Sequence, residues 1–161
     1  MGQRTSQQGI ATLKMLESCK LTAYQCSAGR WTIGYGETGP NIVPGLVWTQ
    51  QQADTALAAA LIPRENKINE LRLTLKQCEF DALVLFEYNT GGFQANIVRT
   101  LLDKIKAKDY VGIQLAFIEW RKERNPVTKQ LVDSAGLLKR RMIESIMFMG
   151  VYTNYADTNP H

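Results

Sequence analysis

One segment of this chain, between residues 18 and 48, lacks the helical spacing of apolar residues that the rest shows, and this segment most constrains the fold. Residues 31–35 (Trp-Thr-Ile-Gly-Tyr) alternate with the period of two that is typical of a strand, among closely spaced glycines. On either side, apolar residues recur at three- and four-residue spacing, which is typical of helices. We therefore expect an α+β fold, in which a small antiparallel sheet lobe and a larger helical lobe meet at a cleft.

The helical part is expected to contain several separate segments within one domain of 161 residues. The pattern predicts helices over residues 6–17, 49–61, 77–88, 95–106, 109–121 and 137–149. Pro63 is expected to interrupt the second helix, which then continues over residues 64–75 as the long connection between the lobes. Loops are expected at 39–45 and 125–126. The sheet-containing lobe should span about residues 18–62 and the helical lobe about residues 1–17 and 76–150, with a loose tail over 151–161.

The scarcity of histidine restricts the chemistry that this chain can perform. The only histidine is the last residue, His161, which argues against a Ser-His-Asp or Cys-His mechanism and against a histidine-rich metal site. The three cysteines are an odd number without paired metal spacing, so at least one thiol is free. We expect no metal or cofactor, and catalysis has to rest on carboxylates, hydroxyls, thiols or amides.

The charge balance favours a polyanionic partner. Nineteen basic and fifteen acidic residues give a formal net charge of +4, which suits nucleic acid, an anionic membrane or an acidic cell wall, although a solvated surface with a small imbalance is an equally good explanation. A nucleic-acid-binding protein is discounted, because no basic stripe with interleaved aromatic residues is present. The polar first eight residues and the lack of a long apolar run predict neither a secretory signal nor a membrane span.

Residues 16–39 contain the most distinctive candidate site. Glu17 ends the first predicted helix, and Cys26 and Thr32 follow nine and fifteen residues later in the glycine-rich sheet. Glycines allow a backbone to approach a bulky ligand, and the neighbouring aromatic side chains can either flank a sugar or pack the lobe. Two plainer interpretations stay open here: Glu17 as a surface residue and Cys26 as a small buried hydrophobic residue.

This segment resembles the active-site signature of the bacteriophage lysozymes or endolysins, glycoside hydrolase family 24. In that pattern a catalytic Glu closes the first helix, an Asp follows nine residues later, and a strand reads Thr-Ile-Gly-Tyr-Gly-His-Thr. Glu17 matches the acid, Tyr24 matches a tyrosine of the signature, and residues 32–36 match the strand. Thr32 falls on the threonine that lies near the attacking water in the family.

Later parts of the chain extend the resemblance to about residues 8–150. Residues 77–83 and 86–91 resemble the family's helix that ends in Phe-Asn-x-Gly, and residues 114–116 with Trp120 resemble a helix that lines the lower cleft. Residues 136–144 resemble the motif Gly-Leu-x-x-Arg-Arg-x-x-Glu. The fold implied by the resemblance is lysozyme-like.

The resemblance implies a muramidase (EC 3.2.1.17) that hydrolyses the β-1,4 bond between N-acetylmuramic acid and N-acetylglucosamine. Glu17 would be the general acid, which requires a carboxyl that is partly protonated near neutral pH. Catalysis would involve Glu17, Cys26 and Thr32. Arg140 or Arg141 would support the acid. Substrate binding would involve Tyr24, Tyr35, Tyr88, Asn89 and Gln114. The implied partner is the peptidoglycan glycan strand. A monomer made in the bacterial cytoplasm would reach the wall from the periplasm, through a holin in phage lysis or through a secretion system as an antibacterial effector.

Two departures from the family pattern bear on that implication. Cys26 stands where the family has Asp, and Glu37 stands where it has His. Cys26 can assist the attacking water together with Thr32, attack the anomeric carbon itself, or be dispensable; we favour Cys26 in the role of the Asp. Glu37 is expected to remove a structural ion pair between the lobes, not a catalytic group. The alternatives are a binding or scaffold domain that has lost hydrolysis, and a transglycosylase that forms an anhydro product.

Overall fold

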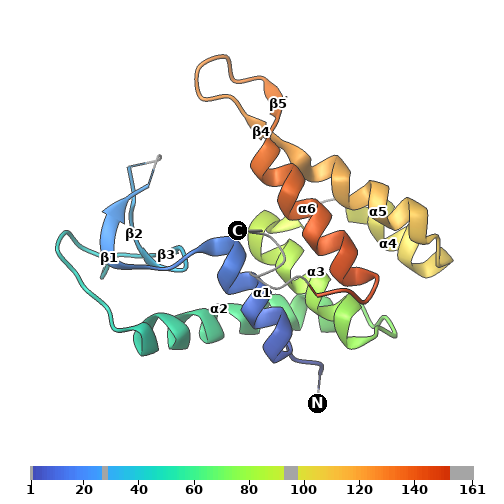
Figure 1. The fold of residues 1–161 in the computed structure, drawn as a ribbon, viewed down its shortest axis with the longest axis horizontal. Coiled ribbons are helices and arrows are strands. Elements are labelled where there is room, and N and C mark those ends of the chain that lie inside the picture. The colour runs from blue at the N-terminus through green and yellow to red at the C-terminus, as the bar shows by residue number, and fades with distance from the viewer. Residues whose placement is uncertain (1, 27–28, 93–97, 153–161) are drawn as a thin grey trace, which may run out of the picture.

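The computed structural model describes residues 2–26, 29–92 and 98–152, and Figure 1 shows their arrangement. The first helix, α1 (Gln7–Glu17), ends as predicted and begins one residue after the predicted start. The Ser6 hydroxyl caps it by accepting the backbone N–H of Gly9. It ends at Glu17 because Ser18 has a φ of 57°, which is outside helical geometry. The expected tail beyond Tyr152, residues 27–28, and the first residues of the helix predicted over 95–106 lie outside the described residues.

A three-stranded antiparallel sheet follows α1, as the alternating pattern predicts. Its strands β1 (Lys20–Gln25), β2 (Trp31–Gly34) and β3 (Glu37–Thr38) lie in the order β1-β2-β3. The tight β2–β3 connection requires positive φ at Gly34 (65°) and Gly36 (110°), conformations that glycine adopts without strain. The register places Glu37 opposite Ile33, so this turn brings Glu37 back towards the buried side of the sheet.

The helix α2 (Gln50–Glu70) joins the sheet to the helical lobe as one continuous helix of 21 residues (Figure 1). The expected interruption at Pro63 is therefore wrong, and so is the continuation to residue 75. Proline removes one backbone N–H, but the ring of Pro63 is exposed while residues on both sides of it, Leu61 and Glu65, are buried. Burial of one face on both sides of the proline holds the helix together.

The regular elements in the rest of the described chain are helices and one short hairpin, joined by loops. Its elements are α3 (Gln77–Thr90), α4 (Arg99–Ala107), α5 (Tyr110–Ile118), a 3₁₀ turn (Glu119–Arg121), β4 (Lys122–Arg124), β5 (Leu131–Asp133) and α6 (Ala135–Phe148). The prediction gives only a loop at 125–126, where the structure has the β4–β5 hairpin. Every residue of these two strands is exposed, so no alternation of buried and exposed positions marks them.

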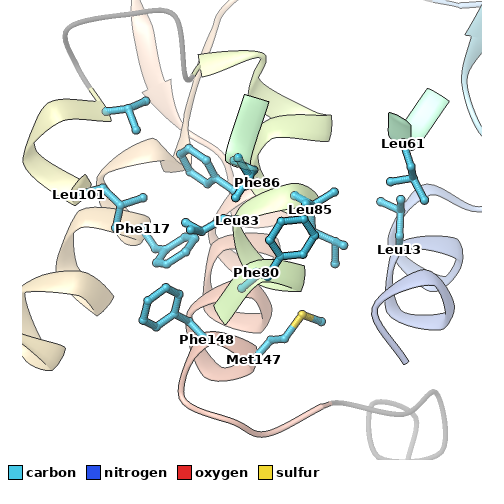
Figure 2. Close-up of a cluster of buried hydrophobic side chains, with 14 of the residues drawn as sticks. Leu13, Leu61, Phe80, Leu83, Leu85, Phe86, Leu101, Phe117, Met147 and Phe148 are labelled. Atoms are coloured by element: carbon cyan, nitrogen blue, oxygen red, sulfur yellow. The ribbon is translucent and has the colours of Figure 1, made fainter. Parts of the chain in front are cut away.

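The hydrophobic core is centred on α3, where every residue from 80 to 87 is buried. Figure 2 shows its side chains interlocking with those of α4, α5 and α6. The rings of Phe86 and Phe117 meet edge to face, with centroids 5.3 Å apart. Because α6 packs along α3, the polar residues in the first half of α6 have a fixed position relative to α1 and the sheet. None of the helices in the described ranges is both long and apolar enough to cross a membrane.

Candidate active site

Glu17 lies where α1 leaves the helical lobe and the chain enters the sheet. Its side chain is 19% exposed, and its Oε1 lies 2.6 Å from Nη1 of Arg140 on α6, which is 9% exposed. The contact lacks the geometry of a hydrogen bond, so attraction between opposite charges holds the pair. The sequence leaves Arg140 and Arg141 as alternative partners, and the structure selects Arg140.

Arg140 is shared with a second, fully buried carboxylate. Its Nε donates to Oε1 of Glu144 at 3.0 Å, and Nη2 of Arg141 donates to the same oxygen at 3.0 Å. Arg141 also donates to Oδ1 of Asn89 at 2.7 Å, which ties α6 to the end of α3. Burial raises the pKa of Glu144 to about 7, although both guanidinium groups favour its charged form. Two acids therefore compete for Arg140, and the network fixes the side chain of Glu17.

Glu37 brings a further carboxyl to the same region from β3. Its Oε2 accepts the backbone N–H of Tyr35 at 2.7 Å. Its Oε1 is buried and has no hydrogen-bond partner among the residues that the structure describes. Burial raises the pKa of Glu37, the charge of Glu17 raises it further, and the guanidinium of Arg64 opposes both. Within the described residues Glu37 forms no ion pair, and the loss of a contact between the lobes stays a prediction.

Tyr88 connects the two lobes beside these acids. Its Oη donates to the backbone oxygen of Tyr35 at 3.2 Å, and the Arg64 guanidinium lies 4.7 Å from its ring centroid. Burial raises the pKa of Tyr88 to about 12, and the charges of Glu37 and Glu17 act in the same direction. Both carboxylates thus act on one phenol. Residues Glu17, Glu37, Tyr88, Arg140 and Glu144 are called the interlobe site below.

Cys26 and Thr32 both lie on the β1–β2 hairpin that follows Glu17. The backbone N–H of Cys26 donates to the oxygen of Arg30 at 2.9 Å, and Oγ1 of Thr32 donates to the same oxygen at 3.2 Å. Thr32 is buried and pairs with Tyr24 in the sheet. The hairpin therefore fixes the two residues relative to each other. Two residues, Ser18 and Cys19, connect Glu17 at the end of α1 to the first strand of this hairpin.

The predicted substrate-binding residues differ in their surroundings. Tyr24 is half-buried beneath Lys20, whose Nζ lies 4.1 Å from its ring centroid. Tyr35 is 4% exposed and its Oη donates to Asp54, while burial raises its pKa to about 12. Asn89 is exposed apart from its bond with Arg141, and Gln114 lies exposed on α5 without a described hydrogen bond to the interlobe site.

Arg64 is the residue beside this site that the sequence interpretation misses. It is the first residue after Pro63, in a segment expected to connect the lobes, and its position on the site side of α2 depends on the helix remaining continuous. The sequence offers a weak signal for Arg64, namely a basic residue within the segment predicted to connect the lobes. Among the described residues, no three His, Cys, Asp or Glu side chains gather in a way that can hold a metal ion.

Comparisons with known proteins find related sequences that match most of this chain. The model of the phage lysozyme family matches residues 14–144. An endolysin of Acyrthosiphon pisum secondary endosymbiont phage 1 is 36% identical over 144 residues, which cover 89% of this chain and 96% of that protein. An endolysin of Salmonella phage P22 is 32% identical over 149 residues, which cover 89% and 97%.

Solved structures show the same likeness in three dimensions. An endolysin from Escherichia coli O157:H7 phage FAHEc1 superposes with a TM-score of 0.83 at 31% identity, over 94% of this chain and 98% of that one. The muramidase domain of SpmX from Asticaccaulis excentricus superposes with a TM-score of 0.78 at 29% identity, over 91% and 97%. Fold and site together define a lysozyme-like hydrolase of the cell wall. Within that class, the chain belongs to the phage lysozyme family.

Proposed function

We propose that this protein is a muramidase that hydrolyses the β-1,4 bond between N-acetylmuramic acid and N-acetylglucosamine in peptidoglycan, and that it serves host lysis as an endolysin. The observation that carries the proposal is the ion pair of 2.6 Å between Glu17 and Arg140, at the helix end where the family signature has its acid. Release through a holin to the periplasmic face of the wall is the route that suits this role.

Glu17 supplies the proton in the proposed reaction. Cleavage moves the carboxyl proton of Glu17 to the bridging oxygen as its bond to the anomeric carbon of N-acetylmuramic acid breaks. Arg140 holds the carboxyl in one orientation, which reduces the entropy lost on reaching the transition state. Arg140 also pairs with Glu144 on its own helix, so its guanidinium is itself held in place beside Glu17.

Cys26 and Thr32 act on the opposite face of the sugar in this proposal. The reaction needs a base or nucleophile there, and the hairpin carries a thiol where the family has a carboxylate. Thr32 positions the attacking water, and Cys26 takes the role of the Asp, as a base towards that water or as the nucleophile. Tyr24, Tyr88, Asn89 and Gln114 are proposed to contact the glycan or its peptide stem, and Tyr35 to shape that surface from within.

Replacing Glu17 tests the assignment directly. The variant Glu17→Gln removes the proton donor but keeps the shape of the side chain, so lysis of permeabilised Gram-negative cells should fall by at least about 10²-fold. Circular dichroism and the melting temperature should show an intact fold. The matched control is Glu70→Gln, which removes an equal charge at the exposed end of α2 and should lyse cells like the wild type. Wild-type rates in Glu17→Gln would contradict the assignment.

Product analysis separates the reaction types. Mass spectrometry of released muropeptides should show hydrated reducing ends, whereas an anhydro product would indicate a transglycosylase. The second candidate, a binding domain without hydrolysis, is favoured by the thiol in place of the family's carboxylate. It would bind purified peptidoglycan in a sedimentation assay yet release no fragments.

A further inference from the structure

We infer that Glu144 is a positioning residue of the proposed active site and acts through two arginines. Through Arg140 it holds the acid Glu17 in one orientation. Through Arg141 it holds Asn89 so that the amide group of Asn89 donates hydrogen bonds to the glycan. The inference rests on the proposed function, because it concerns how the acid and the substrate are placed relative to each other.

One carboxyl oxygen of Glu144 joins two neighbouring arginines of α6. Oε1 accepts from Nε of Arg140 at 3.0 Å and from Nη2 of Arg141 at 3.0 Å. The arginines precede Glu144 by four and three residues, the spacings at which side chains on a helix meet. Adjacent residues on a helix point in different directions, so the two arginines continue from this oxygen towards different elements.

Arg140 has a contact at each of its three guanidinium nitrogens. Nε donates to Glu144, Nη2 donates to the backbone oxygen of Leu85 on α3 at 3.5 Å, and Nη1 lies 2.6 Å from Oε1 of Glu17 on α1. A rigid planar guanidinium that is held at two nitrogens presents the third in one direction. Without the Glu144 contact only the long bond to Leu85 would restrain it, and the position of Glu17 would become less defined.

Arg141 determines which way the amide of Asn89 faces. Nη2 of Arg141 donates to Oδ1 of Asn89 at 2.7 Å, and the guanidinium carbon lies 4.9 Å from the ring centroid of Phe86. A guanidinium can only donate, so the amide oxygen has to face Arg141 and the NH₂ group faces away from it. Arg141 is fully buried whereas Asn89 is exposed near the end of α3, so the two N–H donors of Asn89 lie on its exposed side.

Stability alone does not account for this network. Glu144 and Arg141 are both 0% exposed, and Oε2 of Glu144 has no hydrogen-bond partner among the described residues. Removing charged groups from water is costly, and apolar residues of similar volume often stabilise a protein as well or better. What the network does supply is direction, because it fixes groups of α1 and α3 relative to α6.

Asn89→Asp tests the amide donor while keeping the network. The new carboxylate still accepts from Arg141, but it offers no N–H to the glycan. The KM for soluble, dye-labelled peptidoglycan chains should rise by about 3- to 10-fold with little change in kcat, because a binding contact is lost. The matched control is Asn66→Asp, which adds the same charge at an exposed position of α2 and should keep the wild-type KM. If Asn89 only supports Arg141, its variant will keep that KM too.

Glu144→Gln tests the carboxyl that joins the two arginines. It keeps the size of the side chain but weakens both contacts, so kcat should fall by about 10-fold or more and KM should rise as well. The matched control is Ile143→Ala, which destabilises the same helix by leaving a cavity and should keep kcat and KM while folded. A merely structural role would give Glu144→Gln the kinetic constants of this control. Should Glu144→Gln fail to fold, the shorter Glu144→Asp is expected to show the same two changes.

A binding measurement separates this inference from the proposed function. In the background of Glu17→Gln, addition of Asn89→Asp should raise the Kd for the same chains by about 3- to 10-fold. If the wild type hydrolyses the chains while the variants of Asn89 and Glu144 behave like their controls, the inference is wrong and the proposed function stands. If the wild type releases no fragments, the proposed function fails, and an unchanged Kd would then also exclude Asn89 as a donor to the glycan.

Discussion

Cys26 is the residue of the proposed active site whose chemistry differs most from that of the family signature. A thiol is mostly neutral at neutral pH, whereas an aspartate is charged, so a role for the sulfur requires that its thiolate form take part. Cys26→Ser keeps the size and removes the thiolate. It should reduce the rate of wall hydrolysis by about 10²-fold or more, while Cys26→Asp should retain substantial activity because it restores a carboxylate.

Alkylation provides a second measurement at the same residue. Iodoacetamide should inactivate the wild type, and it should inactivate Cys78→Ser equally. Cys78 is the matched control because it lies on α3, where its sulfur is 3.9 Å from the backbone oxygen of Phe148 in the helical lobe. Full activity of Cys26→Ser would show that the thiol is dispensable and that Glu17 with a water held by Thr32 is sufficient.

Single residues also show what a motif can and cannot predict. The motif near the C-terminus places two adjacent arginines, and adjacent residues on a helix point in different directions, so only one of them can face Glu17. Choosing Arg140 over Arg141 requires the rotation of α6 about its axis, which is set by packing against α3 and not by the motif. Oε1 of Glu37, which has no hydrogen-bond partner among the described residues, is likewise beyond prediction, because its position results from the geometry of the turn between β2 and β3.

At the scale of elements, α2 shows how tertiary burial overrides a local signal. Proline in a helix interior normally breaks the helix at a cost of about 3 kcal/mol. In α2 the apolar residues Leu57, Leu61 and Ile68 are all buried, so the same face is anchored before and after Pro63. Summed local propensities cannot include that anchoring. The β4–β5 hairpin illustrates the opposite case, a pair of strands without any buried face to reveal them.

Replacing Pro63 tests this explanation. Pro63→Ala restores a backbone N–H inside a helix that is already formed, so the variant should be more stable by about 1–2 kcal/mol after the entropy gained by the unfolded chain is subtracted. That gain corresponds to a rise of roughly 2–8 °C in melting temperature for a chain of this size. The matched control is Pro44→Ala in the exposed loop before α2, which should leave stability unchanged or slightly lower. A destabilised Pro63→Ala would contradict this explanation and would mean that α2 depends on its proline.

At the scale of the whole molecule, two buried acids fasten the N-terminal segment to the helical lobe. Asp81 on α3 accepts hydrogen bonds from Ser6, from Gln77 and from Tyr152, so both ends of the described chain meet on α3. Glu65 on α2 binds the residues just before α1. These contacts determine how α1 sits against the bundle and hence where Glu17 lies. Periodicity predicts two lobes, but the sequence carries no signal for the contacts of Ser6 and Tyr152 with Asp81 or of Thr5 with Glu65, which join residues sixty or more positions apart.

The free energy of unfolding at acid pH should depend on Glu65. Burial raises its pKa, but hydrogen bonds from Arg4 (2.7 Å) and from the Thr5 N–H and hydroxyl (2.8 Å each) outweigh burial, so its folded pKa lies below the ordinary value of 4.5. A carboxyl with a lowered pKa binds fewer protons folded than unfolded. Its contribution to the free energy of unfolding is therefore complete above about pH 5 and disappears as the pH falls through 4.5 and below.

Urea unfolding of Glu65→Gln between pH 3 and pH 7 measures that contribution. At pH 7 the variant should be less stable than the wild type by about 1–3 kcal/mol, because the Arg4 pair is lost and a buried amide replaces the carboxylate. The difference should shrink as the pH falls from 4.5 towards the lowered pKa of Glu65, where the wild-type carboxyl takes up a proton. Glu70→Gln, exposed one helical turn further along α2, should follow the wild type at every pH. A difference that stays constant from pH 7 to pH 3 would show that Glu65 stabilises the protein through packing, and that the charge linking the N-terminal segment to α2 does not matter.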